Sequence, residues 1–210
     1  MNDYKALNVI NYYYDACSLK EIERSGWKLW NVARNKRIES IPEHIYGAQH
    51  LAMAIYSEYN LNIDIFKVIT MLSLHETEEI KLGDITPFDT SPAQISAQEA
   101  VEETMSRLTK KNMFIELITE FNEQKTPEAK FAYLCDKLEC DLQAKKYSDE
   151  GRMSFEGVAP QIINNKTVQK IINSGAETVA DVFIEYDKIK YEDSPVFKEI
   201  LELLKICNAG

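Results

Sequence analysis

The sequence predicts an all-α protein, and three observations indicate this class. Only seven glycines and six prolines occur among 210 residues, which leaves room for long helices. Apolar side chains recur at helical spacing, and several such segments begin with Ser-Pro or Thr-Pro, a typical helix start. With 45% hydrophobic and 28% charged residues, the chain can bury a full core. We expect one domain over residues 1–150, with a C-terminal loop and helices over residues 151–210 packed on it.

The first expected helices have clear boundaries. Residues 41–59 follow Ser40, with Pro42 in the first turn and Glu43 placed to complete a capping box. Residues 63–81 keep apolar side chains at helical spacing and stop at Gly83. The aromatic run at residues 12–14 is expected to lie on a helix that packs against the core.

The remaining expected helices alternate with less regular segments. They cover residues 90–108 from Ser91-Pro92, a short piece at 113–121, residues 126–147 from Thr126-Pro127, residues 167–187, and residues 194–207 from Ser194-Pro195. Two glycines and a proline indicate a long loop over residues 148–166. Loops of this length are usually functional or disordered, so a lid or a dimer surface is expected there.

Charge and cysteine usage restrict the function classes. The net charge of −10 argues against a nucleic-acid surface, which requires clustered Lys and Arg. The four cysteines form no CxxC pair and are expected to be free thiols of the reducing cytoplasm. The first residues lack a signal-peptide pattern, and no apolar run approaches the roughly 20 residues of a membrane span. We expect a cytoplasmic protein without membrane contact.

The chain holds only three histidines, His44, His50 and His75. His44 lies in the first turn after the capping box, and His75 lies near the end of the next helix beside Glu76. Asp136 lies inside the helix that begins at Thr126-Pro127. Two imidazoles and two carboxylates from three helices suit a divalent transition metal such as Mn, Fe, Co, Ni or Zn. Such a site leaves positions open for water and a phosphate oxygen.

Glu79 extends this pattern, because it follows His75 by four residues and Glu76 by three. On one continuous helix the three side chains would share a face. Glu79 would then be placed to orient or deprotonate a water molecule, or to protonate a leaving oxygen. Asp84, just past Gly83, would lie at the rim of the same pocket.

Each candidate also has a structural interpretation. His44 and His75 could be hydrogen-bonded histidines at helix ends, and Trp27 could be a core aromatic. Lys137 could bind a phosphate or pair with Glu139. We expect purely structural roles for His50, Trp30, Cys135 and Cys140.

The order His44, His75-Glu76, Asp136 resembles the HD-domain metal-dependent phosphohydrolases. Three flanking segments are similar to motifs of the 5′-deoxynucleotidase-like branch: "GWKLWNVARNKRIESIPEH", "HETEEIKLGD" beside the branch's HDxxExxxGD, and "AKFAYLCDKLECDLQA". The resemblance covers about residues 20–147 and rests on three motifs in the same order. It implies an HD-domain helical bundle with a C-terminal helical extension.

The resemblance also implies a role for each matching residue and a reaction, the removal of phosphate from a deoxyribonucleoside 5′-monophosphate. The substrate is therefore a small nucleotide, and the branch is usually dimeric, so a homodimer is expected. The implied metal ligands are His44, His75, Glu76 and Asp136, with Glu79 as the catalytic residue. Substrate contacts are implied for Arg24 at the phosphate, Trp27 and Asp84 at the sugar, and Lys137.

One position departs from the pattern, since Glu76 stands where the family has aspartate. The extra methylene moves the carboxylate by on the order of an ångström. The linker from Trp27 to His44 is also longer than usual, which makes Arg34 and Arg37 alternative phosphate ligands. Two alternatives to the nucleotidase therefore remain: a phosphohydrolase of another phosphoester, or a degenerate HD protein that binds nucleotide or serves as a scaffold.

Overall fold

The computed structural model describes residues 3–88 and 94–207. All the regular secondary-structure elements in these residues are helices. Within these residues no β-strand forms, and the backbone makes one isolated antiparallel bridge between Glu23 and Ser40. The all-α prediction is confirmed. The chain divides into a first unit, residues 1–24 and 39–133, and a second unit, residues 25–38 and 134–210. The division at residue 150 expected from the sequence stays a prediction.

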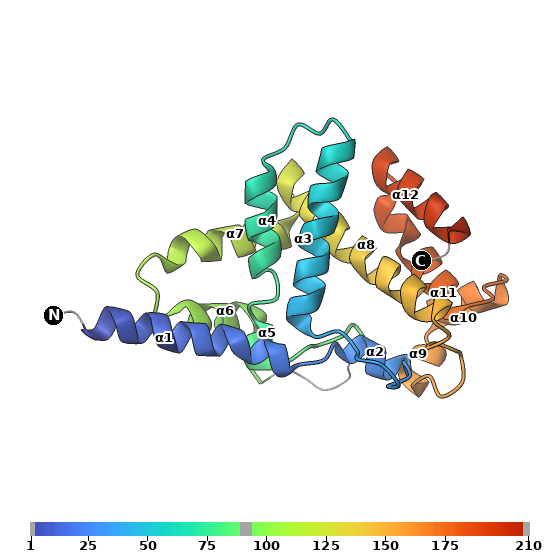
Figure 1. The fold of residues 1–210 in the computed structure, drawn as a ribbon, viewed down its shortest axis with the longest axis horizontal. Helices are drawn as coiled ribbons and strands as arrows, with labels where there is room; N and C mark the ends of the chain where they lie inside the picture. Colours follow the sequence, from blue (N-terminus) through green and yellow to red (C-terminus); the bar gives the residue numbers. More distant parts are fainter. Residues whose placement is uncertain (1–2, 89–93, 208–210) are drawn as a thin grey trace. The chain divides into compact units, whose positions relative to one another are not determined.

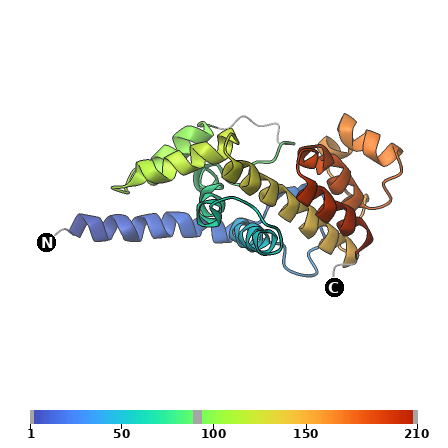
Figure 2. The ribbon, with the colours of Figure 1, turned by 90° about the horizontal axis from the view of Figure 1, so that it is seen from above.

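Among its described residues, the first unit is built from α-helices and one 3₁₀ helix. In it α3 and α4 run side by side, α7 packs on α4, and α6 contacts both α1 and α5 (Figures 1 and 2). Its elements are α1 (Asp3–Cys17), η1 (Ser18–Glu21), α3 (Ile41–Glu58), α4 (Ile65–Leu74), α5 (Glu79–Leu82), α6 (Ala97–Met105), α7 (Lys111–Glu123) and the start of α8 (Pro127–Asp149).

The start of α3 follows the predicted capping box. The backbone N–H and the hydroxyl of Ser40 both donate to the Glu43 carboxylate, at 2.7 and 2.8 Å. Buried residues then recur along one face of the helix: Ile41, His44, Ala48, Ala52 and Ile55. Because His44 belongs to this face, the apolar packing of α3 directs its imidazole inward.

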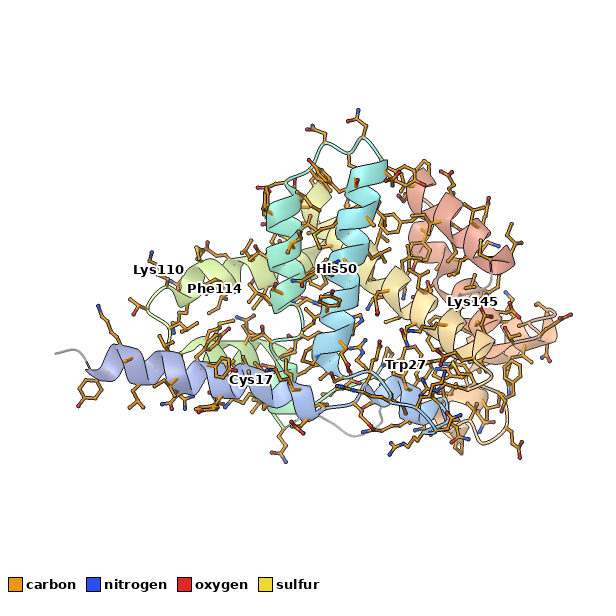
Figure 3. The ribbon with its side chains drawn as sticks, viewed as in Figure 1. Cys17, Trp27, His50, Lys110, Phe114 and Lys145 are labelled. Carbon is orange, nitrogen blue, oxygen red and sulfur yellow. The ribbon has the colours of Figure 1, made fainter. Side chains whose placement is uncertain are left out.

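A core cluster joins α6 and α7. Val101 and Met105 of α6 pack with Ile118 of α7, and Tyr12 of α1 packs against them. Phe114 contributes to the same cluster from α7 (Figure 3). The expectation for the aromatic run is only partly right, because Tyr13 and Tyr14, next to Tyr12, are exposed.

The expected single helix over residues 63–81 is wrong, because the structure interrupts it after Leu74. His75 to Glu78 form a turn, and α5 begins at Glu79. The side chain of Thr77 donates to the Leu74 carbonyl at 2.6 Å, and the Thr77 N–H bonds to the same oxygen at 3.0 Å. These short-range bonds replace the helical pattern. His75 and Glu79 therefore do not share the face of one helix.

Other expected boundaries shift by smaller amounts. The predicted start at Ser91-Pro92 lies outside the described residues, and residues 94–96 are not helical; α6 begins after Ser96, whose hydroxyl accepts from the Glu99 N–H. Helix α7 is longer than the expected 113–121. Helix α8 begins at Pro127 as predicted and ends at Asp149, two residues later than expected.

Up to residue 207, where the described part of the chain ends, the second unit holds the rest of α8 and six shorter elements. They are α2 (Ser25–Leu29), α9 (Pro160–Ile163), α10 (Lys166–Asn173), α11 (Val179–Asp187), η2 (Lys188–Tyr191) and α12 (Pro195–Ile206). The helix expected over residues 167–187 is in fact two, because Gly175 adopts φ +108° and Thr178 caps a new start. The start of α12 at Pro195 agrees with the prediction.

The segment expected as a lid, residues 148–166, is anchored within the second unit. The buried guanidinium of Arg152 donates to the carbonyls of Ala33, Lys36 and Arg37 at 3.0–3.1 Å. It also lies 4.4 Å from the ring centre of Tyr147. The Ala159 N–H bonds to the Leu29 carbonyl at 2.8 Å. These bonds hold Arg152 and Ala159 against residues 29–37 of the same unit. A lid or a dimer surface formed by this segment stays a prediction.

Candidate metal centre

The first unit brings His44, His75 and Glu76 together. His44 lies in the first turn of α3 and is fully buried, and His75 caps the C-terminal end of α4. Glu76 is the second residue of the turn formed by residues 75–78. The turn after α4 thus places Glu76 where its carboxylate faces the two imidazoles.

Distances around Glu76 suit a shared cation. Its Oε1 atom lies 3.5 Å from His75 Nε2 and 3.7 Å from His44 Nε2. Two donor atoms about 2.1 Å from one ion are themselves separated by about 3.0–3.4 Å. The donor atoms of these three residues all lie within 4.8 Å of one another. A small movement of the side chains toward one another would therefore let all three residues bind one ion. Glu76 is within this range despite the extra methylene of glutamate.

A backbone contact sets the tautomer of His75. Its Nδ1 atom lies 2.8 Å from the Leu72 carbonyl oxygen. Because a carbonyl only accepts hydrogen bonds, Nδ1 carries the proton, and in the neutral ring Nε2 holds the lone pair. A backbone carbonyl on the second ring nitrogen is the usual support for a metal-binding histidine. The lone pair of His75 is thus directed toward the side where Glu76 lies.

An arginine also reaches this carboxylate. Arg24 Nη1 donates to Glu76 Oε1 at 2.7 Å and lies 3.5 Å from Asp84 Oδ1. The Arg24 N–H donates to the Glu39 carbonyl at 3.1 Å, beside the bridge that joins Glu23 to Ser40. The same short pairing that precedes α3 therefore fixes the backbone from which Arg24 extends.

Glu79 is a buried acid beside this pair. Burial raises its pKa, and the nearby carboxylates of Glu76 and Asp84 raise it further, to about 10, although Arg24 acts in the opposite direction. At neutral pH and without a cation, Glu79 is therefore a protonated carboxylic acid able to donate a proton. A divalent ion close by would favour its ionised form. Either form suits acid–base chemistry.

Asp136 and Lys137 lie on α8, in the second unit. Asp136 is buried, and Lys137 Nζ lies 2.8 Å from its Oδ2 atom. The positive charge of Lys137 thus accompanies the aspartate itself, a contact that the sequence alternatives did not include. Cys135, one residue earlier, is buried as a packing thiol, in agreement with the expectation.

Trp27 and Trp30 both belong to an aromatic cluster of the second unit. The Trp27 ring meets Tyr147 edge-on at 5.2 Å and stacks on Phe183 at 5.5 Å, and Trp30 lies 5.1 Å from the Phe183 ring. Trp27 is only 3% exposed; Figure 3 shows it on α2. The core interpretation holds for Trp30 and describes the observed contacts of Trp27. His50 is exposed, and its ring lies 4.2 Å from the Tyr46 ring in a tilted arrangement; its expected structural role stays a prediction.

Sequence reasoning missed the contact between Arg24 and Glu76. The two residues are 52 positions apart, and no local pattern connects them. The resemblance assigned both to one site but gave them separate partners, a phosphate and a metal. Charge offered one signal, because the sequence assigns Arg24 to the same expected site as the acidic residues Glu76 and Asp84.

Comparison with known proteins places the chain in a family. A sequence profile of the HD domain matches residues 16–180. The chain belongs to the HD-domain family, and the resemblance seen in its motifs is confirmed.

Two curated relatives and one solved structure illustrate the relationship. The 5′-deoxynucleotidase HDDC2 of Homo sapiens is 30% identical over 176 residues, which cover 78% of this chain and 83% of that protein. The Bos taurus protein of the same name is 29% identical over 189 residues, covering 84% and 89%. A crystal structure described as a predicted metal-dependent phosphohydrolase from Magnetospirillum magnetotacticum aligns with a TM-score of 0.68 at 16% identity, over 98% and 93% of the two chains. This last likeness concerns the fold alone.

The length and hydropathy of the described helices bear on membrane insertion. None of those in residues 3–88 and 94–207 is long and apolar enough to cross a membrane.

Proposed function

We propose that the chain is a metal-dependent phosphohydrolase that removes phosphate from nucleoside 5′-monophosphates, with deoxyribonucleotides preferred. The observation that carries the proposal is the position of Glu76 Oε1, within 3.7 Å of an imidazole nitrogen of both His44 and His75. Membership of the HD family and the names of the curated relatives support the same reaction class.

The proposed ligands are His44, His75, Glu76 and Asp136. The first three meet within the first unit, and Asp136 follows three residues after Tyr133, where the continuous helix α8 passes out of that unit. Mixed nitrogen and oxygen donors suit Mn, Co, Fe, Ni or Zn. A bound ion of this kind would polarise the phosphate and lower the pKa of a water molecule.

The chain's own residues would supply the remaining steps. Glu79 would give a proton to the leaving sugar oxygen in its protonated form, or hold the attacking water in its ionised form. Arg24 would bind the phosphate through its guanidinium fork. Asp84 lies within reach of Arg24 and would contact the sugar, while Lys137 would add a local positive charge near Asp136.

The proposal for Trp27 is narrower than the sequence suggested. Its ring is enclosed by Tyr147 and Phe183, so it would act on the sugar as part of a fixed aromatic wall. A rigid wall rejects an added hydroxyl only by steric exclusion, which gives moderate selectivity. We therefore expect a preference for deoxyribose and no absolute requirement.

Two further features remain proposals. A homodimer is supported by apolar residues that α1 leaves exposed, including Leu7, Ile10 and Tyr14. A cytoplasmic location is supported by the four free cysteines, Cys17, Cys135, Cys140 and Cys207, since oxidising compartments favour disulfides.

A substrate panel tests the proposed reaction. Phosphate release is measured from ribo- and deoxyribonucleoside 5′-monophosphates, using metal-stripped protein resupplied separately with Mn, Co, Ni, Zn and Mg. We expect metal-dependent release that favours deoxy substrates and is lost in His75→Ala. Folded protein that releases no phosphate with any metal would support the degenerate alternative instead, and release from a different phosphoester would redirect the substrate assignment.

A further inference from the structure

One oxygen atom of Glu76 has two functions to serve. Oε1 is the atom that faces His44 and His75, at 3.7 and 3.5 Å, and it is also the atom to which Arg24 donates at 2.7 Å. If the guanidinium held the other carboxylate oxygen, it would simply orient Oε1 toward the imidazoles. In the observed arrangement, it occupies the donor atom itself.

The charges make this sharing unfavourable once a cation is present. The guanidinium cannot lose its proton near neutral pH. The side chains of Arg24 and Glu76 are 16% and 13% exposed, so solvent screens them weakly. A divalent ion that takes Oε1 would face the positive charge of Arg24 across a single atom, and charges at such range repel strongly in a partly buried site.

Arg24 has a second acidic neighbour at hand. Asp84 Oδ1 lies 3.5 Å from the same Nη1 atom, and its side chain is only 5% exposed. The backbone of Arg24 is held by its bond to Glu39. A guanidinium displaced from Glu76 would thus stay beside the site, held by Asp84, with donors turned toward an incoming anion.

We propose that Arg24 competes with the metal ion for Glu76, so that metal binding releases the guanidinium and the released guanidinium binds the phosphate. Arg24 is in this respect a positioning residue that imposes an order, metal before phosphate. The inference rests on the proposed function, since it takes Glu76 as a ligand and phosphate as the anion. In addition, Arg24 lowers the affinity of the site for the metal ion, because it occupies Glu76 until the ion displaces it.

The test measures two affinities that competition moves in opposite directions. Mn²⁺ is titrated into metal-free protein by calorimetry, and inorganic phosphate is titrated into the Mn²⁺-loaded protein. Relative to the unmodified chain, we expect Arg24→Gln to bind Mn²⁺ about tenfold more tightly, because a positive charge next to the ligand is gone, and to bind phosphate more weakly. Arg24→Lys keeps the charge but loses the guanidinium fork. We expect its affinity for Mn²⁺ to lie between that of the unmodified chain and that of Arg24→Gln.

A matched control removes a positive charge elsewhere in the first unit. Lys81 lies on α5 and pairs with Glu103 at 2.8 Å, so Lys81→Gln reports the general effect of lost charge on Mn²⁺ affinity. We expect it to change that affinity by less than about twofold. Unchanged or weaker Mn²⁺ binding in both Arg24 variants would overturn the competition and make Arg24 an orienting partner of Glu76.

Failure of the proposed function gives a different result. If the unmodified chain binds no more Mn²⁺ than His75→Ala, the metal centre itself is wrong and the inference falls with it. If the unmodified chain binds Mn²⁺ and releases phosphate while Arg24→Gln shows no gain in Mn²⁺ affinity, only the competition is wrong. A variant damaged merely in its fold would lose both affinities together, which also contradicts the predicted opposite shifts.

Discussion

The buried pair of Tyr191 and Asp141 gives a stability prediction that can be worked out from the structure. Both residues are fully buried, and the Tyr191 hydroxyl donates to Asp141 Oδ2 at 2.7 Å. Oδ1 of Asp141 is buried and has no hydrogen-bond partner within residues 3–88 and 94–207. Tyr191→Phe therefore leaves a buried carboxyl group without the hydroxyl on which it depends.

The expected loss follows from the state of that carboxyl group. Leaving a buried acceptor unsatisfied costs about 1–3 kcal/mol, and more for a charged group. We expect Tyr191→Phe to lower the free energy of unfolding by about 3 kcal/mol at pH 8. Asp141→Asn keeps an acceptor for the hydroxyl and removes the charge, so its loss is expected to be about 1 kcal/mol or less.

The same pair predicts a dependence on pH. Burial raises the pKa of Asp141 well above its usual range, and the nearby Asp187 carboxylate raises it further, against Tyr191, Lys190 and Lys137. A raised pKa means that the folded state keeps the proton longer than the unfolded state does. The stabilisation is complete below about pH 4 and is lost as the pH rises toward the folded pKa, by at most about 1.4 kcal/mol per pH unit.

Urea unfolding followed by circular dichroism, at pH values from 4 to 8, measures both effects. We expect the stability of the unmodified chain to fall relative to Asp141→Asn as the pH rises, and the two curves to approach each other at low pH. A difference that does not change with pH would refute the reasoning about the buried carboxyl group. Equal stability of Tyr191→Phe and the unmodified chain at pH 8 would refute the hydrogen-bond argument.

Substitutions at Arg152, Glu76 and Ile10 test three other contacts and surfaces. Arg152→Met leaves three backbone carbonyls without their donor and should lower the free energy of unfolding in urea by about 3 kcal/mol; a loss below 1 kcal/mol would mean that water replaces the guanidinium. Glu76→Gln preserves the shape of the side chain but removes its charge and should abolish metal-dependent phosphate release, while retained activity would exclude Glu76 as a ligand. Ile10→Glu, on the exposed face of α1, should give a monomer in light scattering after size-exclusion chromatography, and an unchanged dimer would place the interface elsewhere.

Local signals in the sequence predicted the helices whose ends depend on local chemistry. The capping box of Ser40 and Glu43 and the Thr126-Pro127 start both lie where expected, because the bonds that stabilise them join residues three or four positions apart. The break after Leu74 could not be predicted from the apolar spacing. Threonine does not by itself end a helix, and the hydrogen bond from the Thr77 hydroxyl to the Leu74 carbonyl is visible only in the structure. The break between α10 and α11 was not predicted, although glycine is a typical residue at a helix end and Gly175 adopts a positive φ there.

The candidate site was predictable in membership but not in geometry. The order of motifs assigned His44, His75 and Glu76 to one centre, and the structure brings these three together. No spacing rule could reveal two of the observed contacts, because each joins residues more than 50 positions apart. They are the hydrogen bond between Arg24 and Glu76 and the bonds from Arg152 to the backbone carbonyls near residue 37. The enclosure of Trp27 depends on Tyr147 and Phe183, which is likewise a tertiary contact.

The proposed function depends on a catalytic metal ion held by two histidines and Glu76. Its most direct test is the stoichiometry of Mn²⁺ binding to metal-stripped protein, measured by calorimetry for the unmodified chain, His44→Ala and Glu76→Gln. We expect one ion per chain in the unmodified protein and a loss of at least about tenfold in affinity in each variant. Mn²⁺ binding that is absent from the unmodified chain, or equal in all three proteins, would contradict it.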